Sequence, residues 1–159
     1  MAMPIAASLS PAVAVGAVWL GMVGGGYPDW FDLRSDFSRR LKHRGISHSV
    51  FLGALFTAVV YAVLGILDAQ FHQISVDDTE IRSLALAFGA GFLSHILADT
   101  CTHAGVRLFL PFNSDKWWIL PPFLRSKSDG VANSVVSFLA MLVIVLLLIR
   151  YVSQQTGWI

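Results

Sequence analysis

Residues 28–49, PDWFDLRSDFSRRLKHRGISHS, decide the organisation of this chain because they form its most polar stretch. Three aspartates, two histidines and five lysine or arginine residues fall within these 22 positions. The whole chain of 159 residues is 55% hydrophobic and only 13% charged, whereas soluble domains carry about 25% charged residues. A mean hydropathy of +0.66 agrees with this composition. We therefore expect an integral membrane protein that holds the polar stretch at a membrane surface.

Four apolar segments of about 20 residues lie around this stretch, each long enough to cross a hydrocarbon core of roughly 30 Å. They cover about residues 6–26, 47–67, 84–101 and 132–152. The glycines at 24–26 and the following Pro28 predict that the first helix stops at the interface. Ser47 is the expected N-cap of the second helix. The expected fold class is all-α, with residues 1–159 forming a single transmembrane domain, a bundle of about four helices.

The loops between these segments differ in charge, and this difference predicts the orientation of the chain. Five basic residues fall in the first loop and four in the third, whereas the second loop has only Arg82 against four acidic residues. Because lysine and arginine are retained on the cytoplasmic side, we expect loops one and three in the cytoplasm and both termini outside. The third loop mixes aromatic, basic and proline residues at about 104–125, which is typical of an interfacial segment. A net charge of +1 gives no reason to expect nucleic acid as a partner.

This topology brings polar side chains from three separate spans to the cytoplasmic face. The end of the first span, the start of the second and the end of the third all fall there. The residues concerned are Asp29, Asp32, His43, His48, His95, Asp99 and His103. Neutral imidazole and carboxylate are the usual ligands of zinc and related divalent ions, so this is the composition of a metal site. His103 ranks below the other six, because it shares a face with His95 only if that helix continues.

The spacing within these groups leaves structural alternatives open. His95 and Asp99 are four apart on one helix face, so they can meet one ion or form a hydrogen bond that pins two helices together. Asp29 and Asp32 are three apart and can face one ion from a single turn. They can equally be solvated or helix-capping aspartates in a loop.

His43 and His48 flank Arg44 and are five residues apart, about 140° on a continuous helix. They can therefore converge only if His43 belongs to the loop and His48 to the first turn of the second span. Arg44 is either an anchor on the cytoplasmic side or a guanidinium that grips an anionic substrate. We take Arg44 and Asp32 as the catalytic candidates. Arg44 is the best candidate to hold a phosphate or carboxylate, and an aspartate or histidine that does not bind the ion could serve as general base.

The same motifs resemble the YdjM family of bacterial inner-membrane proteins, described as LexA-regulated or LexA-binding metal-dependent hydrolases. The match rests on PDWFD at residues 28–32, HRGISHS at 43–49 and SHILADTCTHAGVRLFLPF at 94–112, in the family order. Relatives commonly carry a histidine very near the N-terminus, whereas none precedes His43 in this chain. The metal ligands that the resemblance implies are drawn from Asp29, Asp32, His43, His48, His95 and Asp99.

The leading hypothesis is a membrane-bound, metal-dependent hydrolase with one or two divalent ions, zinc first, at the cytoplasmic face of the inner (plasma) membrane. A site at the interface favours membrane lipid as a partner and a lipid or lipid-linked phosphoester as substrate. Two non-enzymatic alternatives are a small ion-binding or transport protein and a membrane scaffold whose histidines and aspartates only pin the bundle. A conduction path should place polar residues at successive depths, and spans one, two and four have almost none at mid-membrane.

Overall fold

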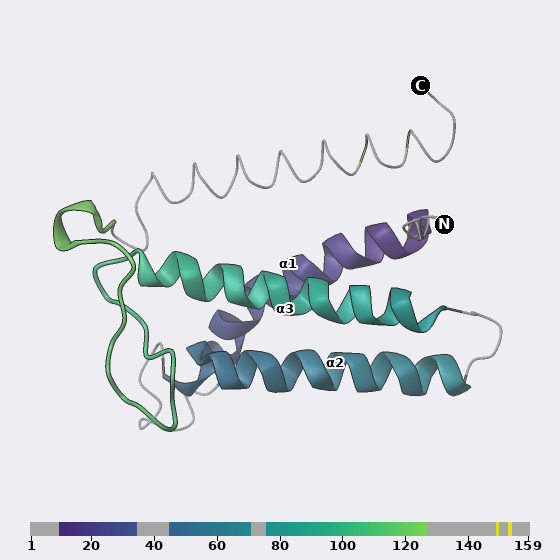
Figure 1. The fold of residues 1–159 in the computed structure, drawn as a ribbon, viewed down its shortest axis with the longest axis horizontal. Coiled ribbons are helices and arrows are strands. Elements are labelled where there is room, and N and C mark those ends of the chain that lie inside the picture. The colour runs from purple at the N-terminus through teal and green to yellow at the C-terminus, as the bar shows by residue number, and fades with distance from the viewer. Residues whose placement is uncertain (1–9, 35–44, 71–75, 127–148, 150–152, 154–159) are drawn as a thin grey trace, which may run out of the picture.

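The computed structural model describes residues 10–34, 45–70, 76–126, 149 and 153, and over these residues the protein is helical without a β-strand. The three α-helices are α1 (Pro11–Arg34), α2 (Val50–Gln70) and α3 (Asp78–Thr100), with the 3-10 turns η2 (Ile46–His48) and η3 (Pro122–Leu124). Figure 1 shows α2 and α3 side by side and antiparallel, with α1 crossing α3. The all-α prediction is thus confirmed for this part of the chain. The expected fourth span lies almost wholly outside it.

Two of these helices, α2 and α3, are long and apolar enough to cross a membrane. They overlap the expected spans at 47–67 and 84–101, although α3 begins six residues earlier than predicted. The early start of α3 has a local cause, because Asp77 and Glu80 form a capping box at its first turn. Whether α1 also crosses the membrane stays a prediction.

The first helix does not stop where the sequence indicates: α1 runs through Pro28 and ends at Arg34. Proline inside a helix costs about 3 kcal/mol through a lost hydrogen bond and a steric clash. Here Pro28 is fully buried, so packing against the rest of the molecule offsets that cost. The continuation matters for the site, because it places the residues after Pro28 on a helix and not in a loop.

The glycines of α1 serve close helix packing. A Cβ atom on Gly24 would clash with the carbonyl oxygen of Phe88, and one on Gly91 would clash with that of Gly21. Small residues at such positions let two helix backbones approach closely, as is common between membrane helices. Two members of the glycine run predicted as a helix end, Gly24 and Gly25, therefore lie in the contact of α1 with α3.

One side of α3 forms the centre of the fold. Its buried side chains recur every three or four residues, the spacing of one helix face. They are Ile81, Ala85, Phe88, Phe92, Ile96 and Asp99. Fully burying one large apolar side chain stabilises by about 1.5–3 kcal/mol. The stripe ends in Asp99, so the periodicity that builds the core also carries a carboxylate into the interior.

The start of α2 differs from the prediction by three residues. Ser49 Oγ accepts a hydrogen bond from the Leu52 backbone N–H at 3.1 Å, which is the geometry of an N-cap. The Val50 N–H donates to the Leu108 carbonyl at 3.0 Å and ties this helix start to the loop that follows α3. Ser47, predicted as the cap, instead lies in η2 with its side chain buried.

Residues 101–126 fold back over the end of α3. The backbone of Val106 pairs with that of Trp117 at 2.8 and 3.2 Å, and the Ile119 N–H donates to the Thr100 carbonyl at 3.2 Å. Gly105 turns this segment with a φ of 66°, a left-handed conformation that favours glycine. In Figure 1 the segment lies at the end of the bundle where α3 ends and α2 begins.

Candidate metal centre

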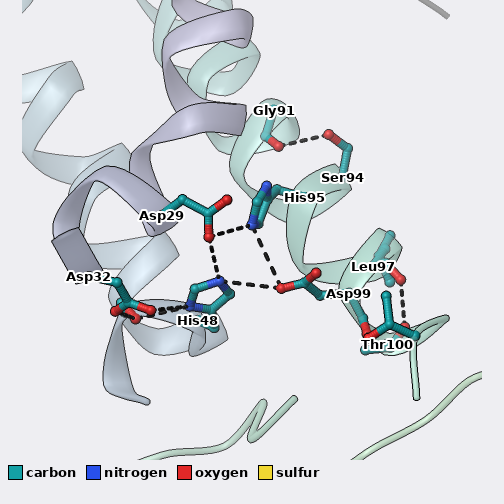
Figure 2. A network of polar contacts seen from close by, with 11 residues as sticks. Asp29, Asp32, His48, Gly91, Ser94, His95, Leu97, Asp99 and Thr100 are labelled. Carbon is teal, nitrogen blue, oxygen red and sulfur yellow. Dashed lines mark hydrogen bonds and ion pairs between the residues drawn. The ribbon is translucent and has the colours of Figure 1, made fainter. Parts of the chain in front are cut away.

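Three elements meet at this end of the bundle and bring five polar side chains together. The C-terminal part of α1 supplies Asp29 and Asp32, η2 supplies His48, and the last turns of α3 supply His95 and Asp99 (Figure 2). Five of the seven residues that the sequence grouped are therefore neighbours, although they come from positions up to 70 apart in the chain.

The close contact of α1 with α3 explains why two of these side chains meet. Gly25 faces Gly91, and a Cβ on Gly25 would lie 3.6 Å from the Gly91 carbonyl oxygen. Asp29 and His95 each follow their glycine by four residues, which is about one helical turn. The carboxylate and the imidazole thus project toward each other one turn beyond the contact of Gly25 with Gly91.

The Nε2 atoms of the two histidines both face the same two carboxylates. His48 Nε2 lies 3.4 Å from Asp29 Oδ1 and 3.3 Å from Asp99 Oδ2. His95 Nε2 lies 3.6 and 3.7 Å from the same two oxygens. Neighbouring ligand atoms around a tetrahedral ion with bonds of 2.0–2.2 Å are about 3.3–3.6 Å apart. One ion could therefore contact both imidazoles and a carboxylate with little movement of the side chains.

These separations exceed the usual length of an N–H···O hydrogen bond, which is about 2.7–3.2 Å. His95 Nε2 is buried and has no hydrogen-bond partner in the part of the chain that the structure describes. A buried polar atom without a partner costs about 1–3 kcal/mol. Coordination of a cation by this nitrogen would remove that cost.

Exposure differs sharply among the four converging side chains. The side chain of His48 is 0% exposed, Asp99 12% and His95 20%, whereas Asp29 is 53% exposed. Solvent therefore reaches the cluster most readily at Asp29, and we call this its open side. Catalytic metal sites keep an accessible position of this kind, whereas structural zinc sites are closed by four protein ligands.

Asp32 lies on the other side of the His48 ring. Its Oδ2 is 3.6 Å from His48 Nδ1, and its Oδ1 accepts a hydrogen bond from the Ser47 hydroxyl. The Ser47 oxygen is also 2.9 Å from His48 Nδ1. Asp29 and Asp32 therefore do not face one common point, because the imidazole separates them.

The remaining candidates are placed as follows. His103 is exposed on the loop after α3, because the helix ends at Thr100 and does not carry it to the face of His95. His43 and Arg44 lie outside the described residues. Ser47 is the residue whose role the sequence-based prediction missed, since it was assigned to capping. Its position directly before His48 in the ISHS run was the available signal.

A comparison with known families agrees with the motifs. The family described as YdjM inner membrane protein matches residues 1–157, essentially the whole chain. The chain belongs to the YdjM family. The resemblance carried by PDWFD, HRGISHS and the segment at 94–112 is thus confirmed, and the two apolar helices α2 and α3 fit a YdjM protein of the inner membrane. No curated protein and no solved structure matches this YdjM chain.

Proposed function

We propose that this YdjM protein is a membrane-bound, metal-dependent hydrolase that uses one or two divalent ions, with zinc the first candidate. The observation that carries the proposal is that each of two imidazole nitrogens lies 3.3 to 3.7 Å from the same two carboxylate oxygens. Nitrogen and oxygen ligands of this type suit zinc and related ions. A bound ion of this kind activates water and polarises the bond that is hydrolysed. His43 stays a predicted further ligand.

Asp29 is the residue best suited to proton transfer. Its exposed carboxylate can be reached by water and substrate, whereas Asp99 is buried against the two histidines. Asp29 can therefore accept a proton from the attacking water, and a positioned general base contributes typically about 10²–10⁴-fold to the rate. Asp32 was a catalytic candidate from the sequence, but the His48 ring separates it from the open side of the cluster. We therefore assign the general-base role to Asp29.

The substrate class is proposed from the surroundings of the cluster. The adjoining segment at residues 101–126 exposes Trp117 and Trp118 together with Lys116. The Arg125 guanidinium lies over the Trp118 ring at 4.7 Å from its centre. Tryptophan and basic residues favour the lipid headgroup region. A lipid or lipid-linked phosphoester is accordingly the proposed substrate, and Arg44 the proposed contact for its anionic group.

The proposed orientation follows the charge of the loops. Loops one and three lie in the cytoplasm in this proposal, the protein crosses the membrane several times, and both termini lie outside. The cluster then faces the cytoplasm, at the inner leaflet.

Zinc content and hydrolysis, measured on the same detergent-purified preparations, test the proposal. Wild type is compared with His48→Gln, His95→Gln and His103→Gln, each checked for monodispersity. We expect about one or two equivalents of zinc in wild type, loss of zinc in the first two variants and wild-type content in His103→Gln. His103 is the matched control because it is an exposed histidine outside the cluster. Phosphate release from phosphatidic acid should follow the zinc content.

Wild type without zinc after reconstitution would contradict the metal site, as would equal zinc in all four proteins. Zinc binding that depends on His48 and His95 but supports no phosphoester hydrolysis would leave an ion-binding protein and remove the enzyme assignment.

A further inference from the structure

We propose that Asp32 and Ser47 do not bind the ion but hold His48 in the tautomer that presents a lone pair on Nε2 to the cluster. This proposal rests on the proposed metal site and concerns two positioning residues behind its most buried ligand. It reassigns Asp32, which the sequence grouped with the ligands.

The direction of the hydrogen bonds follows from counting protons. An ionised carboxylate can only accept, so the single proton of the Ser47 hydroxyl is donated to Asp32 Oδ1. Because the hydroxyl proton is already donated to Asp32, the Ser47 oxygen can only accept a hydrogen bond at its 2.9 Å contact with His48 Nδ1. The proton must then be on Nδ1 of the imidazole. Asp32 Oδ2, at 3.6 Å from the same nitrogen, adds a second negative oxygen beside that N–H.

The consequence appears at the opposite edge of the ring. A neutral imidazole carries one N–H, so a proton fixed on Nδ1 leaves a lone pair on Nε2. That atom faces Asp29 Oδ1 at 3.4 Å and Asp99 Oδ2 at 3.3 Å, and Figure 2 shows the ring lying between these carboxylates and Asp32. Outer partners of this kind orient a ligand histidine, and their loss typically lowers metal affinity about 10–100-fold.

The backbone around His48 holds the ring in place. η2 is a single turn closed by the bond from the His48 N–H to the Gly45 carbonyl at 3.2 Å, and Gly45, Ser47 and His48 are all buried. The imidazole has no exposed surface. Because Ser47 precedes His48 directly, the hydroxyl that sets the tautomer is positioned by the same turn that positions the ring.

Substituting Asp32 should move the imidazole proton of His48 from Nδ1 to Nε2 without removing an atom that we expect to bind the ion. In Asp32→Asn the new amide group can donate to the Ser47 oxygen. The Ser47 hydroxyl is then free to donate to His48 Nδ1, which moves the imidazole proton to Nε2 and blocks the lone pair. Ser47→Ala should act more weakly, because Nδ1–H can still donate to the Asp32 carboxylate. Ser49→Ala is the matched control, since Ser49 is an equally buried neighbouring serine whose hydroxyl serves the start of α2.

The experiment is 15N NMR of histidine-labelled, metal-free, full-length protein in detergent at alkaline pH, where imidazoles are neutral. Correlations between ring protons and ring nitrogens identify which nitrogen carries the proton, and the spectrum of His48→Gln assigns the His48 signals. Zinc titration of the same proteins supplies the second readout. The NMR result does not depend on zinc binding, so failure of the metal site and failure of this proposal are distinguishable.

We expect Nδ1–H on His48 in wild type and Ser49→Ala, and Nε2–H in Asp32→Asn with zinc affinity lowered about 10–100-fold. A smaller loss of affinity is expected in Ser47→Ala. A proton on His48 Nε2 in the wild type would overturn the proposal. If Asp32→Asn does not fold, zinc affinity in Ser47→Ala equal to that of Ser49→Ala would overturn it too.

Discussion

Asp29 and Asp99 contact the same two histidines, but Asp29 is exposed and Asp99 is buried. We therefore expect substitutions at the two positions to affect zinc content and kcat differently. Asp99→Asn should remove most of the zinc, because it alters the buried carboxylate that we expect to bind the ion and that water cannot readily replace. Asp29→Asn should keep the fold and more of the zinc, yet lower kcat by about 10²–10⁴-fold if Asp29 is the general base. Zinc analysis and phosphate release from phosphatidic acid measure the two effects. Equal zinc loss in both variants would contradict the division of roles.

Ser49 offers a test of local structure that is independent of the metal. Ser49→Ala removes the hydroxyl that accepts the Leu52 N–H and should lower the free energy of unfolding by about 1 kcal/mol. Thermal unfolding in detergent measures this loss. Zinc content should be unchanged, and a large drop in zinc would show that Ser49 acts on the cluster and not only on α2.

At the scale of residues, sequence spacing predicted that His95 and Asp99 share a helix face. It did not predict that Asp29 and Asp32 are separated, and the reason is physical. The four-residue spacing of His95 and Asp99 holds on α3, where both now face His48. The separation of Asp29 from Asp32 could not be predicted. It depends on α1 continuing as a helix past Pro28 and on the His48 ring entering between the two carboxylates.

At the scale of elements, the contact between α1 and α3 positions the cluster. Gly91→Ala places a methyl group against the Gly21 carbonyl and should push the two helices apart. We expect a lower melting temperature and less zinc, because His95 lies one turn beyond Gly91 and Asp29 two turns beyond Gly21. Gly26→Ala is the control, since a Cβ there meets no atom within 4 Å. It should be neutral or stabilise by up to about 1 kcal/mol. Equal effects of both variants would contradict the role of this contact.

The helix ends show where local sequence signals are overridden. Glycine and proline at 24–28 predict a break when read alone, because each disfavours the helix locally. In the structure the glycines permit backbone contact with α3, and this tertiary packing favours the continued helix. The capping box of α3 is a local signal that agrees with its tertiary context, and α3 begins there.

At the scale of the whole molecule, the cluster joins three elements that are distant in the chain. A zinc ion bound to His48 and His95 would therefore stabilise the fold, by about 2.7 kcal/mol when free zinc is 100 times its dissociation constant. We expect zinc to raise the melting temperature of the wild type, a chelator to reverse the rise, and His95→Gln not to respond. An unchanged wild-type melting temperature would contradict metal binding across the elements.

The predicted order and direction of the helices indicated that the cluster residues meet at one end of the bundle, and no single motif indicated this as well. Helices that reverse direction from one to the next bring the end of α1, the start of α2 and the end of α3 to one end of the bundle, as Figure 1 shows. Periodicity and charge could not predict the rotation of each helix, which selects Asp29 over Asp32 for the open side. That choice depends on side-chain packing, above all on the glycine contact between α1 and α3.

X-ray absorption at the zinc edge of the zinc-loaded, full-length protein tests the central claim most directly, because it reports the atoms that bind the ion. We predict two imidazole ligands together with carboxylate oxygen at about 2.0–2.2 Å in wild type and His103→Gln, and one imidazole fewer in His95→Gln. Zinc ligated without imidazole, or an unchanged spectrum in His95→Gln, would contradict the assignment of this cluster as the metal centre.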